Sequence, residues 1–218
     1  MRRLAVFARP PVPGRVKTRL SPALPPALAC RLYEAMLADA LAAARHASAD
    51  ERVLYWAEAT ELAAPAGFRV RIQSGEDLGE RLEAAFGELL AGGAHAVILG
   101  ADCPRLDAAR LDAAFAALEE HDVALGAADD GGYDLMGLAR PAPRLLRDIP
   151  WSTARVREVT LERAREAGLN VATLPPLEDL DTPADLARWI ASAATDPALP
   201  PLVTVNALRA LSLLPPAR

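Results

Sequence analysis

Four basic side chains follow the first apolar run of the chain, in the segment "FARPPVPGRVKTRLSP". Arg15, Lys17 and Arg19 are two residues apart, so an extended backbone would place them on one side. Prolines at positions 10, 11 and 13 restrict the free loop, and Gly14 lacks a Cβ that would keep a ligand away. Guanidinium and ammonium groups bind phosphate oxygens. Together with Arg9, these residues predict a di- or triphosphate site. The alternative is a proline-rich loop whose charges face water.

Asp102 and Asp181 are the candidate ligands of a divalent cation. Asp102 follows the apolar run "AVIL", and Asp181 stands in "EDLDTPADL". Mg²⁺ and Mn²⁺ prefer carboxylate and phosphate oxygens, so both residues suit a metal that bridges protein and diphosphate. Thr182 and Asp185 form a helix capping box, whereas Asp181 lies outside it. The alternative is that Asp102 caps a turn before Pro104 and that Asp181 is a surface acid at a helix entrance.

The stretch "ADDGGYDLMGL" is the candidate acceptor side of the site. Two acids before a double glycine give a bare, negatively charged concavity. Asp130 is the predicted general base, because a carboxylate there could accept the proton of an acceptor hydroxyl group. Gly131 and Gly132 would leave room for the substrate, although a pair of glycines is also typical of a hairpin turn.

Two further segments contain candidate substrate contacts. Asp77, in "QSGEDLGERL", could contact a base or a ribose, and helix capping explains it almost as well. Trp151, in "IPWSTARV", could form the wall of an acceptor pocket, although aromatic residues more often anchor the core. Ser152 or Thr153 is expected to cap the helix that follows.

The composition argues against several classes of protein. The 218 residues carry a net charge of -5, which argues against general binding to nucleic acid or to an anionic membrane. No apolar run approaches the ~18 residues of a membrane span. Cys30 and Cys103 have neither the spacing of a disulfide framework nor a CxxC motif, and they indicate a reducing, cytoplasmic setting. Walker A, GxGxxG, HExxH and GxSxG motifs are missing from the sequence, which disfavours P-loop NTPases, dinucleotide dehydrogenases, zinc enzymes and serine hydrolases.

Strands and helices that alternate along the chain must position these residues. Apolar runs and alternating patterns predict strands at 4–8, 52–57, 68–73, 96–99, 123–127, 133–138 and 170–174. Helical spacing predicts helices at 25–47, 78–91, 107–120, 153–167 and 182–193. This order predicts an α/β fold with a mainly parallel sheet, helices on both faces, and one antiparallel excursion at the turn near residue 130. The strand at 96–99 should be central.

The same pattern gives the expected domain organisation. Residues 1–194 should form one domain, and the proline-containing tail at 195–218 should pack on its surface or on the partner subunit of a homodimer. Ligands of open α/β sheets bind at the carboxyl ends of strands, where both the basic loop and Asp102 are expected.

Five motifs in one order resemble a bacterial family of nucleotide-diphospho-sugar transferases. They are "FARPPVPGRVKTRL", "LGADCPRL", "DDGGYDLMGL", "IPWST" and "LEDLDTPADL", and the resemblance covers roughly residues 4–190. This family includes glycosyltransferase-A-like and arsenosugar-biosynthesis-type glycosyltransferases, and it is similar to the molybdenum-cofactor and 2-phospholactate guanylyltransferases. The resemblance implies a Rossmann-like glycosyltransferase-A fold that binds a nucleotide with Mg²⁺ or Mn²⁺.

The resemblance also implies roles for matching residues. Lys17 and Arg19 would hold phosphates, Asp102 would hold the metal, Asp181 would lie near a second metal position, and Asp130 would face the acceptor. The basic loop departs from the LAGGxGxRxxxxK pattern of nucleotidyltransferases, and the segment after the fourth strand lacks a clear DxD. Both departures leave the reaction type open. The departure of the loop from the glycine-rich pattern favours sugar transfer slightly, whereas its "KTRL" ending, which is similar to guanylyltransferase loops, keeps nucleotidyl transfer as a close alternative.

Three hypotheses follow for the function. The first is transfer of a sugar from a nucleotide-diphospho-sugar to a small-molecule acceptor, with Asp130 as base and Lys17 stabilising the departing diphosphate. The second is nucleotidyl transfer from an NTP to a phosphorylated small molecule with release of pyrophosphate, with Lys17 on the α-phosphate. The third is a nucleotide-binding protein without turnover.

Overall fold

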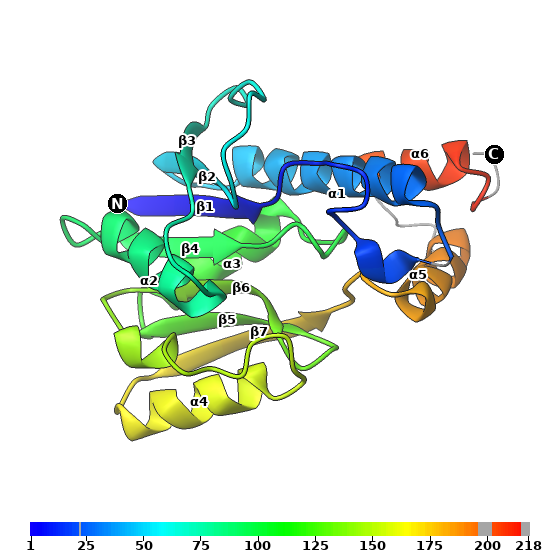
Figure 1. Ribbon diagram of the computed structural model, residues 1–218. Helices are drawn as coiled ribbons and strands as arrows, with labels where there is room; N and C mark the ends of the chain where they lie inside the picture. Colours follow the sequence, from blue (N-terminus) through cyan, green and yellow to red (C-terminus); the bar gives the residue numbers. More distant parts are fainter. Residues whose placement is uncertain (22, 196–201, 215–218) are drawn as a thin grey trace.

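One mixed sheet runs through the protein (Figure 1). The computed structural model describes residues 1–21, 23–195 and 202–214, and in this part of the chain seven strands form a sheet in the order β3-β2-β1-β4-β6-β5-β7. Only β6 is antiparallel to its neighbours, β4 and β5, so the predicted antiparallel excursion and the central place of β4 are confirmed. The strands are β1 (Arg2–Ala8), β2 (Glu51–Trp56), β3 (Arg69–Ile72), β4 (His95–Leu99), β5 (Val123–Ala128), β6 (Tyr133–Leu138) and β7 (Val171–Leu177).

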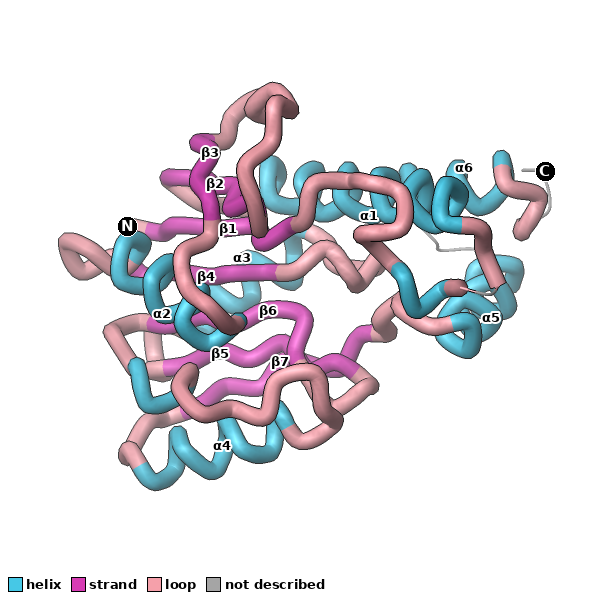
Figure 2. Tube along the Cα trace, in the orientation of Figure 1, coloured by secondary structure: helices cyan, strands magenta, loops and turns pink. Residues whose placement is uncertain are grey.

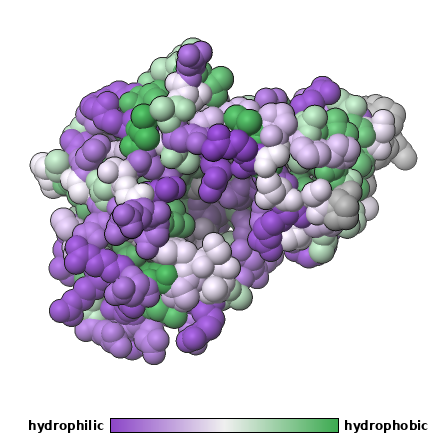
Figure 3. Space-filling model, viewed as in Figure 1, coloured by the Kyte–Doolittle hydropathy of each residue, from purple (hydrophilic) through white to green (hydrophobic). Residues whose placement is uncertain are grey.

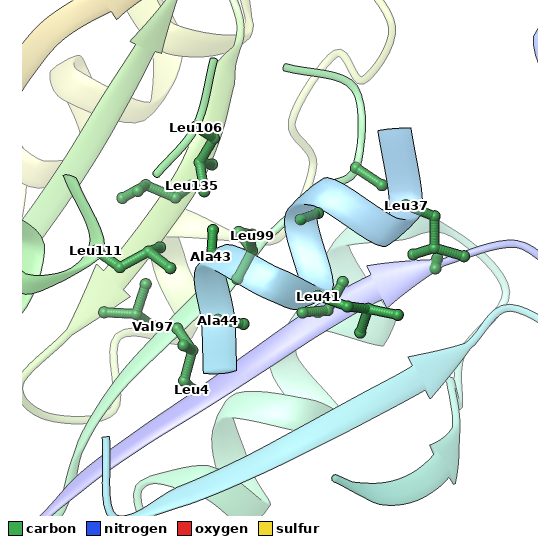
Figure 4. Packing of buried hydrophobic residues seen from close by; sticks show 14 of the residues in the cluster. Leu4, Leu37, Leu41, Ala43, Ala44, Val97, Leu99, Leu106, Leu111 and Leu135 are labelled. Carbon is green, nitrogen blue, oxygen red and sulfur yellow. The ribbon is translucent and has the colours of Figure 1, made fainter. Parts of the chain in front are cut away.

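Helices cover both faces of the sheet, as the sequence predicts. Side chains alternate along a strand, so Leu4 and Val6 of β1 enter one core while Ala5 enters the other. Figure 4 shows the first core, in which Leu4 and Val97 of the sheet lie close to Ala44. The helices on this face are α1 (Pro26–His46) and α3 (Ala108–Ala117), and those on the other are α2 (Leu78–Leu89) and α4 (Val156–Glu166).

A third core lies where α1 meets the last two helices, α5 (Pro183–Thr195) and α6 (Val203–Ala210). Trp189 of α5 and Leu208 of α6 are fully buried in this core, which also contains Leu20 of the loop after β1. The buried Asp39 carboxylate of α1 accepts hydrogen bonds of 2.7 and 2.8 Å from the backbone N–H groups of Val203 and Thr204, so it caps α6. Residues 202–214 of the tail thus pack on α1 of their own chain, whereas 196–201 and 215–218 lie outside the described residues.

The structure corrects two local predictions. Helix α6 is not predicted by the sequence pattern, because its β-branched start, Val203 to Val205, has low helical propensity. Packing on α1 and the cap by Asp39 stabilise it. Neither Ser152 nor Thr153 is the N-cap of α4 as expected, since α4 begins only at Val156 and Arg155 precedes it without a side-chain cap. Thr153 instead stabilises the preceding turn, where its Oγ1 accepts a 3.3 Å hydrogen bond from the backbone N–H of Arg155. No helix of the described chain is long and apolar enough to cross a membrane.

Candidate functional site

A cleft of about 1010 Å³ opens at the carboxyl ends of β1 and β4. These strands are parallel neighbours, so the loops that follow them lie on the same side of the sheet, as Figure 2 shows in pink. Figure 3 shows this face hollowed near its centre, with hydrophilic residues on the rim. The basic side chains that line the cleft are Arg9, Arg15, Lys17, Arg19 and Arg81. The acidic ones are Glu76, Asp77, Asp102, Asp134 and Asp181.

Lys17 is the centre of the charged cluster. Its Nζ atom lies 2.7 Å from Oδ1 of Asp102 and 3.6 Å from Oδ1 of Asp181, and its side chain is only 2% exposed. On the rim, the Nη1 atom of Arg19 lies 2.7 Å from the other carboxylate oxygen of Asp181. The structure therefore brings two predicted phosphate ligands and both predicted metal ligands into one contact network.

The loop after β1 holds Lys17 by its backbone conformation. The backbone N–H of Arg15 donates a 2.9 Å hydrogen bond to the carbonyl of Val12, which closes a turn over Pro13 and Gly14. Gly14 has a φ of 79°, and a turn of this kind favours proline followed by glycine at these two positions. No atom lies within 4 Å of a Cβ added at Gly14, so the turn itself explains this glycine. Lys17 has a φ of 47°, a conformation uncommon for a residue other than glycine. The buried side chain of Leu20 anchors the short 3-10 turn that follows.

Two contacts join the loop after β4 to the entrance of α5. The backbone N–H of Leu180 donates a 2.9 Å hydrogen bond to the carbonyl of Asp102. The thiol of Cys103 donates to Oδ1 of Asp179 at 2.6 Å. Asp185 accepts from the backbone N–H groups of Thr182 and of its neighbour at position 181, at 2.7 and 3.2 Å, as the predicted capping box requires. This clamp leaves the side chain of Asp181 directed at Lys17 and Arg19.

Charge and burial set the protonation of the cluster. Burial alone would lower the pKa of the Lys17 ammonium, but the Asp102 carboxylate beside it raises that pKa above its ordinary value. In turn, the positive charge of Lys17 holds the pKa of Asp102 below its usual range despite desolvation. Both groups are therefore ionised at neutral pH. Burial also raises the pKa of Asp179 to about 7, and the negative charges of Asp130 and Asp102 add to this shift.

Asp134, which the sequence motifs did not indicate as a site residue, lines the cleft from β6. Its side chain is 1% exposed, and Oδ2 lies 2.8 Å from Nε of Arg110 in α3. Gly126 of β5 must lack a side chain, because an added Cβ would lie 1.9 Å from Oδ1 of Asp134. In the sequence, the signal for this residue was an acid two positions after the double glycine, within an apolar strand. Its pairing with Arg110 of α3 could not be predicted, because that contact depends on the fold.

The structure does not bring the predicted acceptor residues into the cleft. Asp130, Gly131 and Gly132 are outside its lining, and Oδ1 of Asp130 accepts a 2.8 Å hydrogen bond from the backbone N–H of Gly132. Gly131 has a φ of 91°, and an added Cβ would lie 2.2 Å from the carbonyl oxygen of Ala154. A close turn against the start of α4 thus explains Gly131.

The remaining predicted contacts line the cleft with other partners. Asp77 caps α2, since Oδ1 accepts a 2.9 Å hydrogen bond from the backbone N–H of Glu80. Trp151 packs its ring edge-on against Tyr133, with centroids 6.3 Å apart. Arg15 forms an ion pair of 2.7 Å with Glu58 on the exposed surface.

Arg9 differs from these residues, because the backbone holds it in place. The hydroxyl group of Tyr33 accepts from the backbone N–H of Arg9 at 2.9 Å and donates to its carbonyl at 3.0 Å. Among the described residues, the Arg9 guanidinium makes no ion pair within 4.0 Å. Its charge nevertheless contributes to the lowered pKa of Asp102, so this guanidinium is available to a ligand in the cleft.

Asp102 and Asp181 are carboxylates of the kind that could hold a divalent cation together with substrate phosphates. In the described part of the chain, no group of three or more His, Cys, Asp or Glu side chains could hold a metal alone. Mg²⁺ is commonly bound through one or two carboxylates and completed by substrate phosphates and water. The side chains of Asp102 and Asp181 are 59% and 32% exposed, so oxygen atoms remain accessible from the cleft.

The sheet order and the charged cleft together define an α/β protein of the Rossmann-like, glycosyltransferase-A class. The chain belongs to the family described as "Uncharacterized protein conserved in bacteria (DUF2064)", whose model matches residues 32–153. No curated protein matches the chain.

Solved structures share this fold. The crystal structure titled "putative nucleotide-diphospho-sugar transferase", from Desulfovibrio desulfuricans G20, has a TM-score of 0.88 and 28% identity, over 97% of this chain and 95% of that one. A structure described as a "Putative Glucose-1-Phosphate Thymidylyltransferase", from Bacillus anthracis, has a TM-score of 0.55 and 12% identity, over 90% of this chain and 96% of that one. A manganese complex of Rv0371c from Mycobacterium tuberculosis H37Rv has a TM-score of 0.51 and 19% identity, over 88% and 98%.

These similarities confirm the predicted resemblance and the predicted fold class. The similarity to the Desulfovibrio structure also confirms that the protein is an enzyme of the transferase type. The alternative of a binding protein without turnover finds no support among these structures.

Proposed function

We propose that the protein is a metal-dependent, glycosyltransferase-like enzyme that uses a nucleotide-diphospho-sugar donor and a small-molecule acceptor. One observation carries the proposal, namely that Lys17, Arg19, Asp102 and Asp181 converge in one cleft at the ends of β1 and β4. Such a set of cations and metal-binding carboxylates matches the diphosphate of the donor. Similarity to the Desulfovibrio structure over nearly the whole chain supports the same class of donor.

Lys17 and Arg19 have different tasks in this proposal. The Lys17 ammonium is almost fully buried, and a charge in a water-poor site stabilises a developing negative charge more strongly than one in water. It would therefore stabilise the departing diphosphate. The Arg19 side chain is 69% exposed and would bind the donor at the mouth of the cleft. Arg9, without an ion pair among the described residues, would contact the same phosphates.

Asp102 and Asp181 would hold Mg²⁺ or Mn²⁺. The bound metal supplies positive charge that neutralises the phosphate oxygens of the leaving group. The manganese complex of Rv0371c, which shares the fold, is in line with this assignment. Trp151 and Tyr133 would form an apolar wall for the acceptor, since both line the cleft.

Nucleotidyl transfer is the second candidate, and the place of Asp130 favours it. Sugar transfer to a hydroxyl group needs a base, but the predicted base lies outside the cleft lining and is bonded to the Gly132 backbone. A phosphate nucleophile is already ionised, so nucleotidyl transfer needs only positioning and charge stabilisation. Lys17 would then contact the α-phosphate of an NTP, and pyrophosphate would be released.

A ligand screen followed by two product assays tests the proposal. Thermal unfolding is measured with nucleotides, NTPs and nucleotide sugars, with and without Mn²⁺, because a ligand of the native state raises its stability. The best ligands are then assayed for release of nucleoside diphosphate from a nucleotide sugar and for release of pyrophosphate from an NTP with a sugar phosphate. Acceptor-dependent release of nucleoside diphosphate supports sugar transfer, and pyrophosphate release supports nucleotidyl transfer. If none of these ligands stabilises the protein, both sugar transfer and nucleotidyl transfer are contradicted.

We also propose a cellular compartment for the enzyme. Cys30 and Cys103 are both free and buried, which fits a reducing, cytoplasmic compartment. Contact with a partner subunit of a homodimer stays a prediction.

A further inference from the structure

Lys17 occupies the carboxylate oxygens that a metal would need. Its Nζ atom lies 2.7 Å from Oδ1 of Asp102 and 3.6 Å from Oδ1 of Asp181. The Nη1 atom of Arg19 forms an ion pair of 2.7 Å with the second carboxylate oxygen of Asp181. An ammonium group and a divalent cation both bind carboxylate oxygens, so the two compete for the same atoms.

The net charge of the cluster of Lys17, Arg19, Asp102 and Asp181 determines which ligands it can bind. Asp102 and Asp181 carry two negative charges, and Lys17 and Arg19 carry two positive charges, so the four side chains are neutral together. A divalent cation added alone would leave an excess of positive charge in a partly buried site, which is unfavourable. A diphosphate that enters with the cation removes this excess and offers new acceptors to Lys17.

Local structure lets Lys17 change partner without refolding of the loop. Its backbone is fixed between the buried side chains of Val16 and Leu20. The side chain itself is a flexible stem with a compact charge at its end, so the ammonium can move by rotation about side-chain bonds. Exchange of a carboxylate for a phosphate oxygen therefore needs no movement of the fold.

We infer that Lys17 couples metal binding to diphosphate binding. In the free protein its ammonium is the counter-ion of Asp102 and Asp181, and it weakens their binding of the metal. When diphosphate oxygens bind the ammonium, both aspartates become available to the cation. Metal and diphosphate thus raise each other's affinity by the same factor. This inference rests on the proposed function only in taking a diphosphate as the anion.

Calorimetry of Mn²⁺ binding tests the inference without any activity assay. Mn²⁺ is titrated into the wild-type protein and into the Lys17→Met and Lys17→Gln variants, with no nucleotide present. The inference predicts that both variants bind Mn²⁺ on the order of tenfold more tightly than the wild type, within the usual range of coupling between sites. Arg140→Gln is the matched control, because it removes one positive charge from an exposed pair with Asp122 outside the cleft. Its Mn²⁺ affinity should equal that of the wild type.

Inorganic pyrophosphate provides the second arm. The Mn²⁺ affinity of each protein is measured again with saturating pyrophosphate, after subtraction of the Mn²⁺ that free pyrophosphate binds in a protein-free titration. The ratio of the Mn²⁺ affinities with and without pyrophosphate measures the coupling. Direct attraction between the cation and pyrophosphate is common to both proteins, so the ratio should be on the order of tenfold larger in the wild type than in Lys17→Met. Unchanged or undetectable Mn²⁺ binding by both Lys17 variants overturns the inference, and so does an equal ratio in the wild type and in Lys17→Met. If the wild type turns over no nucleotide while the Lys17 variants bind Mn²⁺ more tightly, the proposed function fails and the inference stands.

Discussion

The ammonium of Lys17 lies 2.7 Å from the carboxylate of Asp102, although the two residues follow different strands, β1 and β4. The parallel pairing of these strands brings the two loops together, and the contact between Leu180 and the carbonyl of Asp102 adds the entrance of α5. A buried cation with two partly exposed acids results at one end of the sheet.

Replacement of Lys17 by alanine should weaken binding of the nucleotide ligand. A charge-assisted hydrogen bond to phosphate contributes about 1.5–3 kcal/mol, so the dissociation constant should rise by about tenfold to somewhat over a hundredfold. Calorimetry with the ligand found by the thermal screen measures this change. Unchanged affinity would remove the loop after β1 from the phosphate site.

Replacement of Arg110 by alanine should destabilise the fold strongly. Arg110 and Asp134 have side chains that are 10% and 1% exposed, and removal of one partner leaves a buried carboxyl group uncompensated. The expected loss is about 3–5 kcal/mol in the free energy of unfolding, measured with urea. Arg140→Ala, which breaks an exposed pair with Asp122, should cost far less. Equal losses in the two variants would show that the buried pair of Arg110 and Asp134 contributes no more to stability than the exposed pair of Arg140 and Asp122.

Asp134 should also make stability depend on pH. Burial raises the pKa of its carboxyl group above the ordinary value, although Arg110 opposes the shift. The native state then keeps a proton that the unfolded chain releases, so the free energy of unfolding decreases as pH rises from about 4 through the raised pKa. Asp134→Asn should remove this contribution, and the difference between variant and wild type should change over that window. Parallel curves of unfolding free energy against pH would argue against the shift.

The thiol of Cys103 should stabilise the clamp between the loop after β4 and the entrance of α5. Cys103→Ser keeps a donor for Asp179, whereas Cys103→Ala leaves a partly buried carboxyl group without it. The alanine variant should lose about 1–3 kcal/mol relative to the serine variant in the free energy of unfolding. Equal stability of the two variants would mean that the contact with Asp179 is dispensable.

Much of the fold could be read from local pattern, because hydrophobic periodicity reports the burial of each element. The rule that ligands bind at strand ends placed Lys17 and Asp102 on the same side of the sheet. The left-handed backbone of Lys17 and the clamp of Cys103 on Asp179 depend on contacts distant in sequence. The pair of Asp134 and Arg110 likewise depends on how α3 packs on the sheet, which periodicity does not report.

The effect of Asp102→Asn on the metal dependence of nucleotide binding tests the central claim most directly. An amide keeps the shape of the side chain but removes the charge that a divalent cation requires. In the wild type, Mn²⁺ should strengthen nucleotide binding measured by calorimetry, and in Asp102→Asn this enhancement should disappear. A variant that keeps the full Mn²⁺ enhancement would contradict the account, because the metal would then be held elsewhere.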